Sequence, residues 1–324
     1  MVLVTGATGL IGSFVCKTLL ESGFRVRALF RESSDLSLVS GFKERIAWVE
    51  ADVLDPLKLE MAMQGVEVIV HAAAIISFHK QDHNAMLKTN VEGTANVVNA
   101  ASRAGIKQMI HISSVAALGR TKNAGTIDEN SKWINSSYNT GYAISKYLAE
   151  LEVWRGQEEG LNAVIINPSV VLGPGDWEKS STRLFKYVWD KNRFYTKGSM
   201  NYVDVRDIAE VVNRLMNANI SGERFIVSAG NISYKDIFAL IAERFQRKAP
   251  NLAINKPLLS IASLFSQIGS FFTGSRPLVS RESANMAGLS FYYDNRKLQN
   301  ALNFRFRSLE DTLDWTCQAL QAKN

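Results

Sequence analysis

The sequence predicts an α/β fold, with a doubly wound parallel sheet and a smaller, mostly helical C-terminal lobe. Short apolar segments alternate with longer helical segments through the first half of the chain, which is typical of parallel strands covered by helices on both faces. A glycine-rich turn at residues 6–12 directly follows the first apolar segment. Beyond residue 168 the alternation ends and helical patterns dominate, which predicts the second lobe.

The first segment, residues 2–12, reads as a buried strand and a glycine turn, followed by a helix at 14–21. Its glycines recur every third residue, so the loop can turn tightly and bring backbone N–H groups close to a pyrophosphate. The N-terminus of the following helix supplies unpaired donors and a positive dipole end. The pattern therefore indicates a dinucleotide site. The residues expected to contact the cofactor here are Gly6, Thr8, Gly9, Leu10, Ile11 and Gly12.

The other elements follow in chain order. Further strands of the sheet are expected at residues 24–30, 46–50, 66–71, 108–113 and 164–167, and long helices at 81–104 and 138–159. After them we expect helices at 181–190 and 205–217, an extended segment near Tyr202, and a strand at 224–227. The tail reads as helical pieces near 233–247, 258–272, 278–288 and 308–321.

These elements predict two parts of the chain. Residues 1–168 are expected to form a dinucleotide-binding domain, with 203–230 packing back onto it. Residues 169–202 and 231–324 are expected to form the substrate-binding lobe. Ligands of doubly wound sheets bind beyond the carboxyl ends of the strands, so functional residues are expected at strand ends or on the helices that follow.

Composition narrows the class of protein. The 37 basic and 31 acidic residues give a net charge of +6, without a basic run interleaved with aromatics, so nucleic-acid binding is not expected. Cys16 and Cys317 lie far apart, which fits neither a disulfide framework nor a metal site and indicates a reducing compartment. Because the first strand begins at once and the longest uncharged run, 257–275, is amphipathic, we expect a cytoplasmic protein without a signal peptide or membrane span.

The end of the second strand predicts which dinucleotide binds. An acidic residue there bonds the 2′-hydroxyl of NAD, whereas an arginine pairs with the 2′-phosphate of NADP. Arg31 occupies this place and favours NADP, but the adjacent Glu32 could reach the ribose and leaves NAD open. Asp52 could contact adenine or belong to the start of the next helix. The contacts expected from the third and fourth strand ends are Asp52, Val53, Ala72 and Ala73.

The chemistry is expected from Tyr142 and Lys146, one helical turn apart on one face. A tyrosine hydroxyl normally titrates near pH 10, and an ammonium group within a few Å lowers that pKa and makes the hydroxyl a better proton donor or acceptor. Lys146 could also bond the nicotinamide ribose. Ser114 ends the fifth strand and could bond the substrate oxygen. Asn90 could brace Lys146 through its backbone or a water.

These motifs occur together in one order: GxxGxxG at 6–12, DV at 52–53, NVxGT at 90–94, SS at 113–114, YxxxK at 142–146 and NPS at 167–169. Over roughly residues 1–230 the chain resembles an extended short-chain dehydrogenase/reductase of the NAD-dependent epimerase/dehydratase superfamily. The resemblance implies a Rossmann domain and hydride transfer to or from a nicotinamide. It also implies catalysis by Ser114, Tyr142 and Lys146, with cofactor contacts from Tyr142, Lys146, Pro168 and Ser169.

The branch of the superfamily is indicated by two stretches. No carboxylate follows Ser114 at 115–119, which argues against a sugar-nucleotide dehydratase. The runs NPSVVLGPG at 167–175 and YVDVRD at 202–207 are similar to the dihydroflavonol reductase and 3β-hydroxysteroid dehydrogenase branch. We therefore expect an NAD(P)-dependent oxidoreductase that reduces a ketone or aldehyde of a small, fairly apolar substrate, with Tyr142 as the proton donor. The alternatives are a nucleotide-sugar epimerase with tightly bound NAD, and a sensor or scaffold that binds NADP without catalysis.

The remaining expectations concern metals, the pocket and assembly. The four histidines have no paired ligand spacing, so no metal is expected. The long helices at 81–104 and 138–159 could form a two-fold homodimer interface, as resembling enzymes often do. The C-terminal lobe is rich in aromatic residues that could line an apolar pocket or fill the core: Phe265, Phe271, Phe272, Phe291, Tyr292 and Tyr293.

Overall fold

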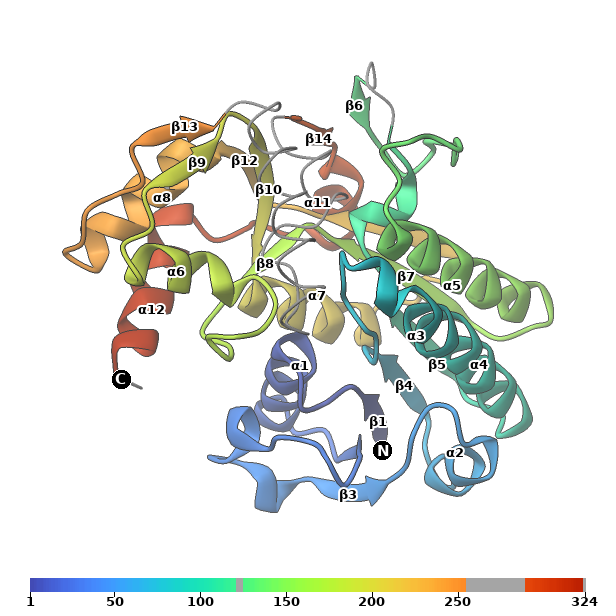
Figure 1. Cartoon of the computed structure of the whole chain (residues 1–324). Helices are drawn as coiled ribbons and strands as arrows, with labels where there is room; N and C mark the ends of the chain where they lie inside the picture. Colours follow the sequence, from blue (N-terminus) through green and yellow to red (C-terminus); the bar gives the residue numbers. More distant parts are fainter. Residues whose placement is uncertain (121–124, 255–288, 323–324) are drawn as a thin grey trace.

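The computed structural model describes residues 1–120, 125–254 and 289–322. Its centre is a seven-stranded sheet in the order β11-β7-β5-β4-β1-β2-β3, in which all neighbouring strands are parallel (Figure 1). The strands are β1 (Val2–Thr5), β2 (Val26–Phe30), β3 (Ala47–Glu50), β4 (Val68–His71), β5 (Gln108–Ile112), β7 (Ala163–Pro168) and β11 (Glu223–Val227). The chain order reverses between β1 and β4, as in a doubly wound sheet. The predicted fold class is confirmed.

Helices bury both faces of this sheet. On one face α1 (Leu10–Glu21) packs against α7 (Val205–Asn217), and on the other α4 (Gly93–Arg103) packs against α5 (Gly141–Glu158) and α2 (Pro56–Ala62) (Figure 1). Side chains of each strand alternate between the two cores. In β1, Val2 and Val4 join the α1 and α7 side, and Leu3 joins the α2 and α4 side. This double burial explains why the strands read as continuous apolar runs.

Helix boundaries follow local capping chemistry. The first helix starts at Leu10 rather than at residue 14 because Gly9 already serves as its N-cap. The side chain of Thr140 accepts a hydrogen bond from the backbone of Ala143 and so starts α5. The helical segment expected at 81–104 is interrupted by a π-helical turn at Leu87–Glu92, which the sequence did not predict.

The C-terminal lobe combines helices with two small sheets. Its helices in the described residues are α6 (Thr182–Trp189), α8 (Tyr234–Arg244) and α12 (Leu309–Gln321), whereas α11 (Arg296–Leu302) packs on β11 and α7 of the sheet domain. One small sheet has the order β12-β10-β8, and another pairs β13 with β9. Its short strands, all but β10 missed by the sequence prediction, are β8 (Val170–Leu172), β9 (Phe194–Thr196), β10 (Ser199–Asp204), β12 (Gly230–Ser233) and β13 (Leu252–Ile254).

Some expectations lie outside the described residues. They are the helical pieces near 258–272 and 278–288, with the aromatic residues Phe265, Phe271 and Phe272. Phe291 is described and is buried, whereas Tyr292 is exposed on the short strand β14 (Tyr292–Tyr293), which pairs with β6 (Thr126–Ile127).

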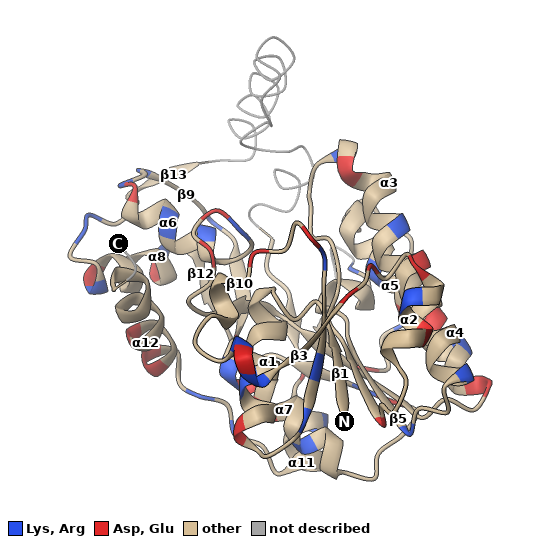
Figure 2. Ribbon diagram, turned by 90° about the horizontal axis from the view of Figure 1, so that it is seen from below, with Lys and Arg blue, Asp and Glu red and all other residues tan. Residues whose placement is uncertain are grey.

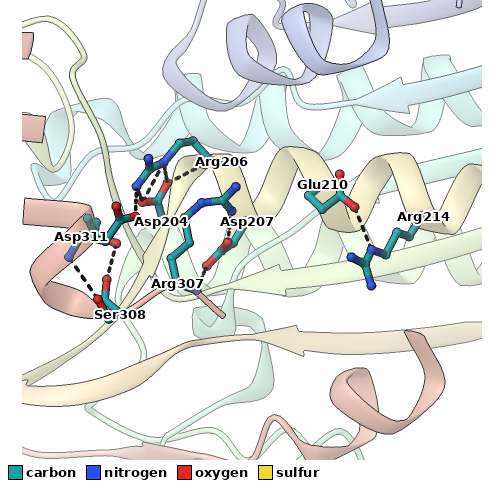
Figure 3. A network of polar contacts seen from close by, with 9 residues as sticks. Asp204, Arg206, Asp207, Glu210, Arg214, Arg307, Ser308 and Asp311 are labelled. Atoms are coloured by element: carbon teal, nitrogen blue, oxygen red, sulfur yellow. Dashed lines mark hydrogen bonds and ion pairs between the residues drawn. The ribbon is translucent and has the colours of Figure 1, made fainter. Parts of the chain in front are cut away.

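A polar network ties the C-terminal segment to the start of α7 (Figure 3). Asp207 is fully buried and accepts a hydrogen bond from the backbone N–H of Arg307 at 3.0 Å, in addition to an ion pair with the Arg307 guanidinium. Arg206 joins Asp204 at 2.6 Å to Asp311 of α12 at 2.7 Å. A buried carboxylate needs such partners, so this network holds α12 and the preceding loop against the sheet domain.

Charge is distributed over the outside of the molecule. Figure 2 shows both signs interspersed on the outer helices, including α4 and α5. Within the described ranges, no helix is long and apolar enough to cross a membrane, and no three His, Cys, Asp or Glu side chains gather as a metal site.

Candidate active site

A cavity of about 390 Å³ opens beyond the carboxyl ends of β1, β2, β3 and β4, beside the point where the strand order reverses. This is the place at which doubly wound sheets bind ligands. Most of the predicted cofactor contacts line it: Thr8, Gly6, Gly9, Leu10, Arg31, Asp52, Val53, Ala72 and Ala73. Six predicted contacts do not line it: Ile11, Gly12, Tyr142, Lys146, Pro168 and Ser169.

The three glycines of the loop meet different requirements. Gly6 has φ +66°, and a Cβ there would lie 2.6 Å from the backbone nitrogen of Ala73. A Cβ on Gly12 would lie 2.1 Å from the carbonyl oxygen of Gly6, whereas one on Gly9 would meet only that oxygen, at 3.4 Å. Gly6 and Gly12 therefore allow the loop, β4 and α1 to approach closely, and Gly9 borders the cavity. Ile11 packs against the core on the α1 side.

Arg31 lies at the adenosine end of the predicted cofactor site. Its Nη1 lies 3.7 Å from Oδ2 of Asp52, and its side chain is 60% exposed, so the guanidinium keeps donors for a further anion. Asp52 also accepts a hydrogen bond from the backbone of Leu54 at 2.9 Å, while Asp55 caps α2. Of the two roles left open for Asp52, helix capping is thus excluded.

The substrate lobe supplies one wall of the same cavity. Gly175, Asp176, Lys179, Ser180 and Thr182 all line it, from the loop before α6 and the start of that helix. Sequence reasoning missed these residues, although the GPG turn at 173–175 marked a loop at this place. Lys179 lies 3.0 Å from Asp176. Hydrogen bonds from Ser37 lower the pKa of Asp35, which also lines the cavity, and the charge of Lys179 makes a smaller contribution in the same direction.

Tyr142 stands in the first turn of α5, next to Ser114 at the end of β5. Burial raises the pKa of Tyr142, while a hydrogen bond with Ser114 and the charge of Arg120 lower it. The expected effect of Lys146 on this pKa is absent among these causes, and the net shift is opposite to the prediction. The hydroxyl therefore keeps its proton at neutral pH, which suits a proton donor.

Lys146 is buried and donates a hydrogen bond from Nζ to the carbonyl of Ile112 at 2.9 Å. Burial lowers the pKa of Lys146 to about 8, and the charge of Glu150 opposes this shift. Glu150 lies one turn further along α5. It accepts hydrogen bonds from Asn167 at 2.5 Å and from Arg224 at 3.2 Å, and Asn167 also donates to the backbone carbonyl of Ser114 at 2.9 Å.

This network was missed by sequence reasoning. Glu150 follows Lys146 by four residues, the spacing of neighbours on one helix face, and that signal could have found it. Its buried carboxylate acts on the lysine through its charge, and Asn167 links it by hydrogen bonds to the strand end that carries Ser114.

The side chain of Asn90 makes its direct hydrogen bonds to Ile75 and Ser145 rather than to Lys146. Its Oδ1 accepts from the backbone N–H of Ile75 at 2.7 Å, and its Nδ2 donates to the Ile75 carbonyl and the Ser145 hydroxyl, each at 2.9 Å. Ile75 lies in the loop after β4 that lines the cavity. From the π-helical turn, Asn90 thus joins that loop to α5.

Comparisons with known proteins identify the family. A model of the NAD-dependent epimerase/dehydratase family matches residues 2–228. The chain belongs to this family. The predicted resemblance is confirmed, and with it a Rossmann fold and an NAD(P)-dependent enzyme acting on carbonyl or hydroxyl groups.

Several relatives of this chain are named as reductases, and Sterol demethylase protein B of Methylococcus capsulatus is 30% identical over 79% of this chain and 78% of its own. A Synechocystis protein named "Putative dihydroflavonol 4-reductase" is 31% identical over 96% of this chain and 91% of its own. Cinnamoyl-CoA reductase 1 of Petunia hybrida is 30% identical over 76% of this chain and 77% of its own.

Solved structures show the same fold. The crystal structure of gox2253 is similar with a TM-score of 0.85 and 31% identity, covering 100% of this chain and 98% of that one. The dTDP-glucose 4,6-dehydratase DesIV of Streptomyces venezuelae, with NAD bound, has a TM-score of 0.81 at 20% identity, covering 99% of this chain and 97% of that one. At that identity the likeness concerns the fold alone.

Proposed function

We propose that this enzyme reduces a ketone or aldehyde group of a small, largely apolar substrate, with Tyr142 giving the proton to the carbonyl oxygen. The observation that carries the proposal is the placement of Tyr142 in the first turn of α5, one helical turn before the buried Lys146 and next to Ser114 after the end of β5. A bound nicotinamide cofactor supplies the hydride that adds to the carbonyl carbon.

The residues of the chain then have separate roles. The glycine loop and the helix start behind it hold the pyrophosphate, because Gly6, Thr8, Gly9 and Leu10 line the cavity beyond the end of β1. Ser114 orients the substrate oxygen beside Tyr142. Lys146, held by its hydrogen bond to the Ile112 carbonyl, supplies a positive charge near Tyr142, and the charge of Glu150 supports its protonated form. We include Pro168 and Ser169 as contacts near the nicotinamide end, outside the cavity described above.

Relatives favour reduction over epimerisation. Several relatives at 30–31% identity are named as reductases, and one is named as a sterol demethylase protein, whereas the structures titled as dehydratases and epimerases lie at 18–20% identity. A panel of ketones, aldehydes and nucleotide sugars, followed by NADPH absorbance and product analysis, tests the proposal. Net consumption of NADPH with a carbonyl substrate is expected. Cofactor that stays bound through dialysis, with an epimerised sugar as the product, would contradict it.

We propose NADP rather than NAD as the preferred cofactor, since Arg31 presents an exposed guanidinium at the cavity and Lys179 adds a second cation. Arg31→Ser is expected to weaken NADPH binding about tenfold to a hundredfold, as for the loss of a charged hydrogen bond, and to leave NADH binding nearly unchanged. Fluorescence titration of both cofactors measures this. Arg25→Ser, an exposed arginine just before β2, is the matched control. Tighter binding of NADH than of NADPH by the unmodified enzyme would reverse the assignment.

The buried Lys146–Glu150 pair predicts a pH dependence. Lys146, whose pKa lies at about 8, carries its proton below that pH, so kcat/KM should fall as the pH rises through about 8. Glu150→Gln removes the negative charge that supports the ammonium, and the descending limb should move to lower pH by about one unit. The control is Glu152→Gln, a surface residue on the same helix that pairs with Arg155. An unchanged limb in Glu150→Gln would show that Lys146 does not set it.

Two further proposals concern location and assembly. Both cysteines are free and buried thiols, which supports a reducing compartment and hence a cytoplasmic enzyme. A homodimer formed through α4 and α5 stays a prediction.

A further inference from the structure

Arg120 is a cation beside the proposed proton donor that neither the cofactor site nor the buried network uses. It follows Gly119, which has φ +73°, in the loop that continues from β5 past Ser114. Its charge acts on two tyrosines, Tyr142 of α5 and Tyr234 at the start of α8. The guanidinium therefore lies where the sheet domain and the C-terminal lobe face each other.

The position of Arg120 is fixed from both sides. Its backbone N–H donates to the side chain of Asn139 at 3.1 Å, and its carbonyl accepts from the hydroxyl of Ser136. Its Nε donates to the hydroxyl of Tyr293 at 3.1 Å, and its Cζ lies 5.2 Å from the centre of the Phe291 ring.

Phe291 is itself held in place. Its carbonyl accepts hydrogen bonds from Asn201 at 2.7 Å and Asn231 at 3.1 Å. The aromatic support of the guanidinium thus belongs to the ordered lobe, and the cation does not depend on one flexible side chain for its orientation.

The guanidinium has donors to spare. No carboxylate pairs with Arg120 in the part of the chain that the structure describes, and Nη1 and Nη2 have no hydrogen-bond partner there. Arg120 as a residue is half-buried rather than fully enclosed. A planar guanidinium with two free nitrogens matches a carboxylate or phosphate, which it binds with two parallel hydrogen bonds.

We propose that Arg120 is a substrate-binding residue, which recognises an anionic oxygen group, carboxylate or phosphate, on the carbonyl substrate. This rests on the proposed reductase function and narrows its substrate class. The aromatic rings of Tyr293 and Phe78, the latter 6.2 Å from the Tyr142 ring, suit an apolar or aryl body for the same substrate. The substrate is thus a small aryl or alkyl carbonyl compound with one anionic end.

Substrate pairs that differ only in charge test the proposal. We would compare benzoylformate and 4-oxo-4-phenylbutanoate with their methyl esters, and dihydroxyacetone phosphate with dihydroxyacetone, by NADPH consumption. The unmodified enzyme is expected to prefer an anion to its neutral partner in kcat/KM. Comparison of the carboxylate pairs with the phosphate pair shows which of the two anionic groups the enzyme prefers.

Arg120→Gln is expected to lower kcat/KM for the anions by about tenfold to a hundredfold, the size of a lost charged hydrogen bond, and to change the esters by less than about threefold. Tyr293→Phe, which removes only the Nε acceptor, should give a smaller loss in the same direction. Circular dichroism verifies that both variants fold.

Two results would overturn the inference while leaving the reductase function intact. One is equal or better turnover of the neutral partners by the unmodified enzyme. The other is an equal loss for acids and esters in Arg120→Gln, which would mean that the cation acts only on Tyr142. If no carbonyl compound is reduced, the proposed function itself fails. Calorimetry would then compare the binding of mandelate and of methyl mandelate to the NADP-loaded protein. Tighter binding of mandelate that is lost in Arg120→Gln supports the anion site at Arg120, and equal binding of the two compounds rejects it.

Discussion

Tyr142→Phe is expected to lower the turnover number for carbonyl reduction by about a hundredfold to ten-thousandfold, the usual contribution of a positioned general acid. The substitution removes one oxygen and its proton, and it leaves the ring beside Phe78 in place. Cofactor affinity should be nearly unchanged, because Tyr142 does not line the cavity that holds the predicted adenosine and pyrophosphate contacts. Steady-state rates and NADPH titrations of the same preparation measure both quantities.

The matched control lies on the same helix. Tyr147 stacks on Trp133 with ring centres 4.3 Å apart and planes at 9°, and Tyr147→Phe keeps that stacking. It should therefore keep full turnover. Near-normal turnover in Tyr142→Phe would reject Tyr142 as the proton donor, and a parallel loss of NADPH affinity would indicate a damaged pocket rather than a missing acid.

The parts of the site that sequence could predict are those built by local patterns. Gly6, Arg31, Asp52 and Ala73 each end a strand or begin the next turn, and the carboxyl ends of parallel strands meet at one edge. The alternation of strands and helices implies a parallel sheet, and in such a sheet these four residues must lie at the same edge. Tyr142 and Lys146 were found by helical spacing in the same way.

Burial and long-range packing lay beyond those patterns. The ammonium of Lys146 donates to the Ile112 carbonyl, and burial raises the pKa of Tyr142 by more than the Ser114 hydrogen bond and the Arg120 charge lower it. Neither the direction of the lysine side chain nor the burial of the tyrosine can be deduced from the spacing of the two residues in the sequence. Lys179 reaches the cavity from the C-terminal lobe, and Tyr293 binds Arg120 although the two residues are far apart in the sequence. Such contacts between distant segments leave no local pattern.

The short strands of the lobe were missed for a related reason. Strands β8 and β9 have three residues each, too few to show a period of two. They form because partners far along the chain pair with them. The π-helical turn that carries Asn90 is likewise invisible, since an apolar pattern does not distinguish it from an α-helical turn.

The second large expected effect concerns the glycine loop, where the same change from glycine to alanine should have different effects on stability at residues 12 and 9. Gly12→Ala places a methyl group 2.1 Å from the Gly6 carbonyl oxygen and 2.8 Å from the Cα of Ala7, and backbone atoms cannot yield as a side chain can. The free energy of unfolding should fall by about 3 kcal/mol, the upper end for overpacking. Urea unfolding followed by circular dichroism measures this.

Gly9→Ala is the matched partner. Its methyl group would meet only the Gly6 oxygen at 3.4 Å, and Gly9 has an ordinary φ of −82°, so the fold should lose less than about 1 kcal/mol. Gly9 borders the cavity, however, where the backbone must approach the pyrophosphate, and NADPH affinity should fall about tenfold or more. Equal stability of the two variants would show that α1 does not need a glycine at residue 12. Undiminished NADPH binding by Gly9→Ala would mean that the pyrophosphate does not pass over this turn, and the cofactor would then have to enter the cavity by another path.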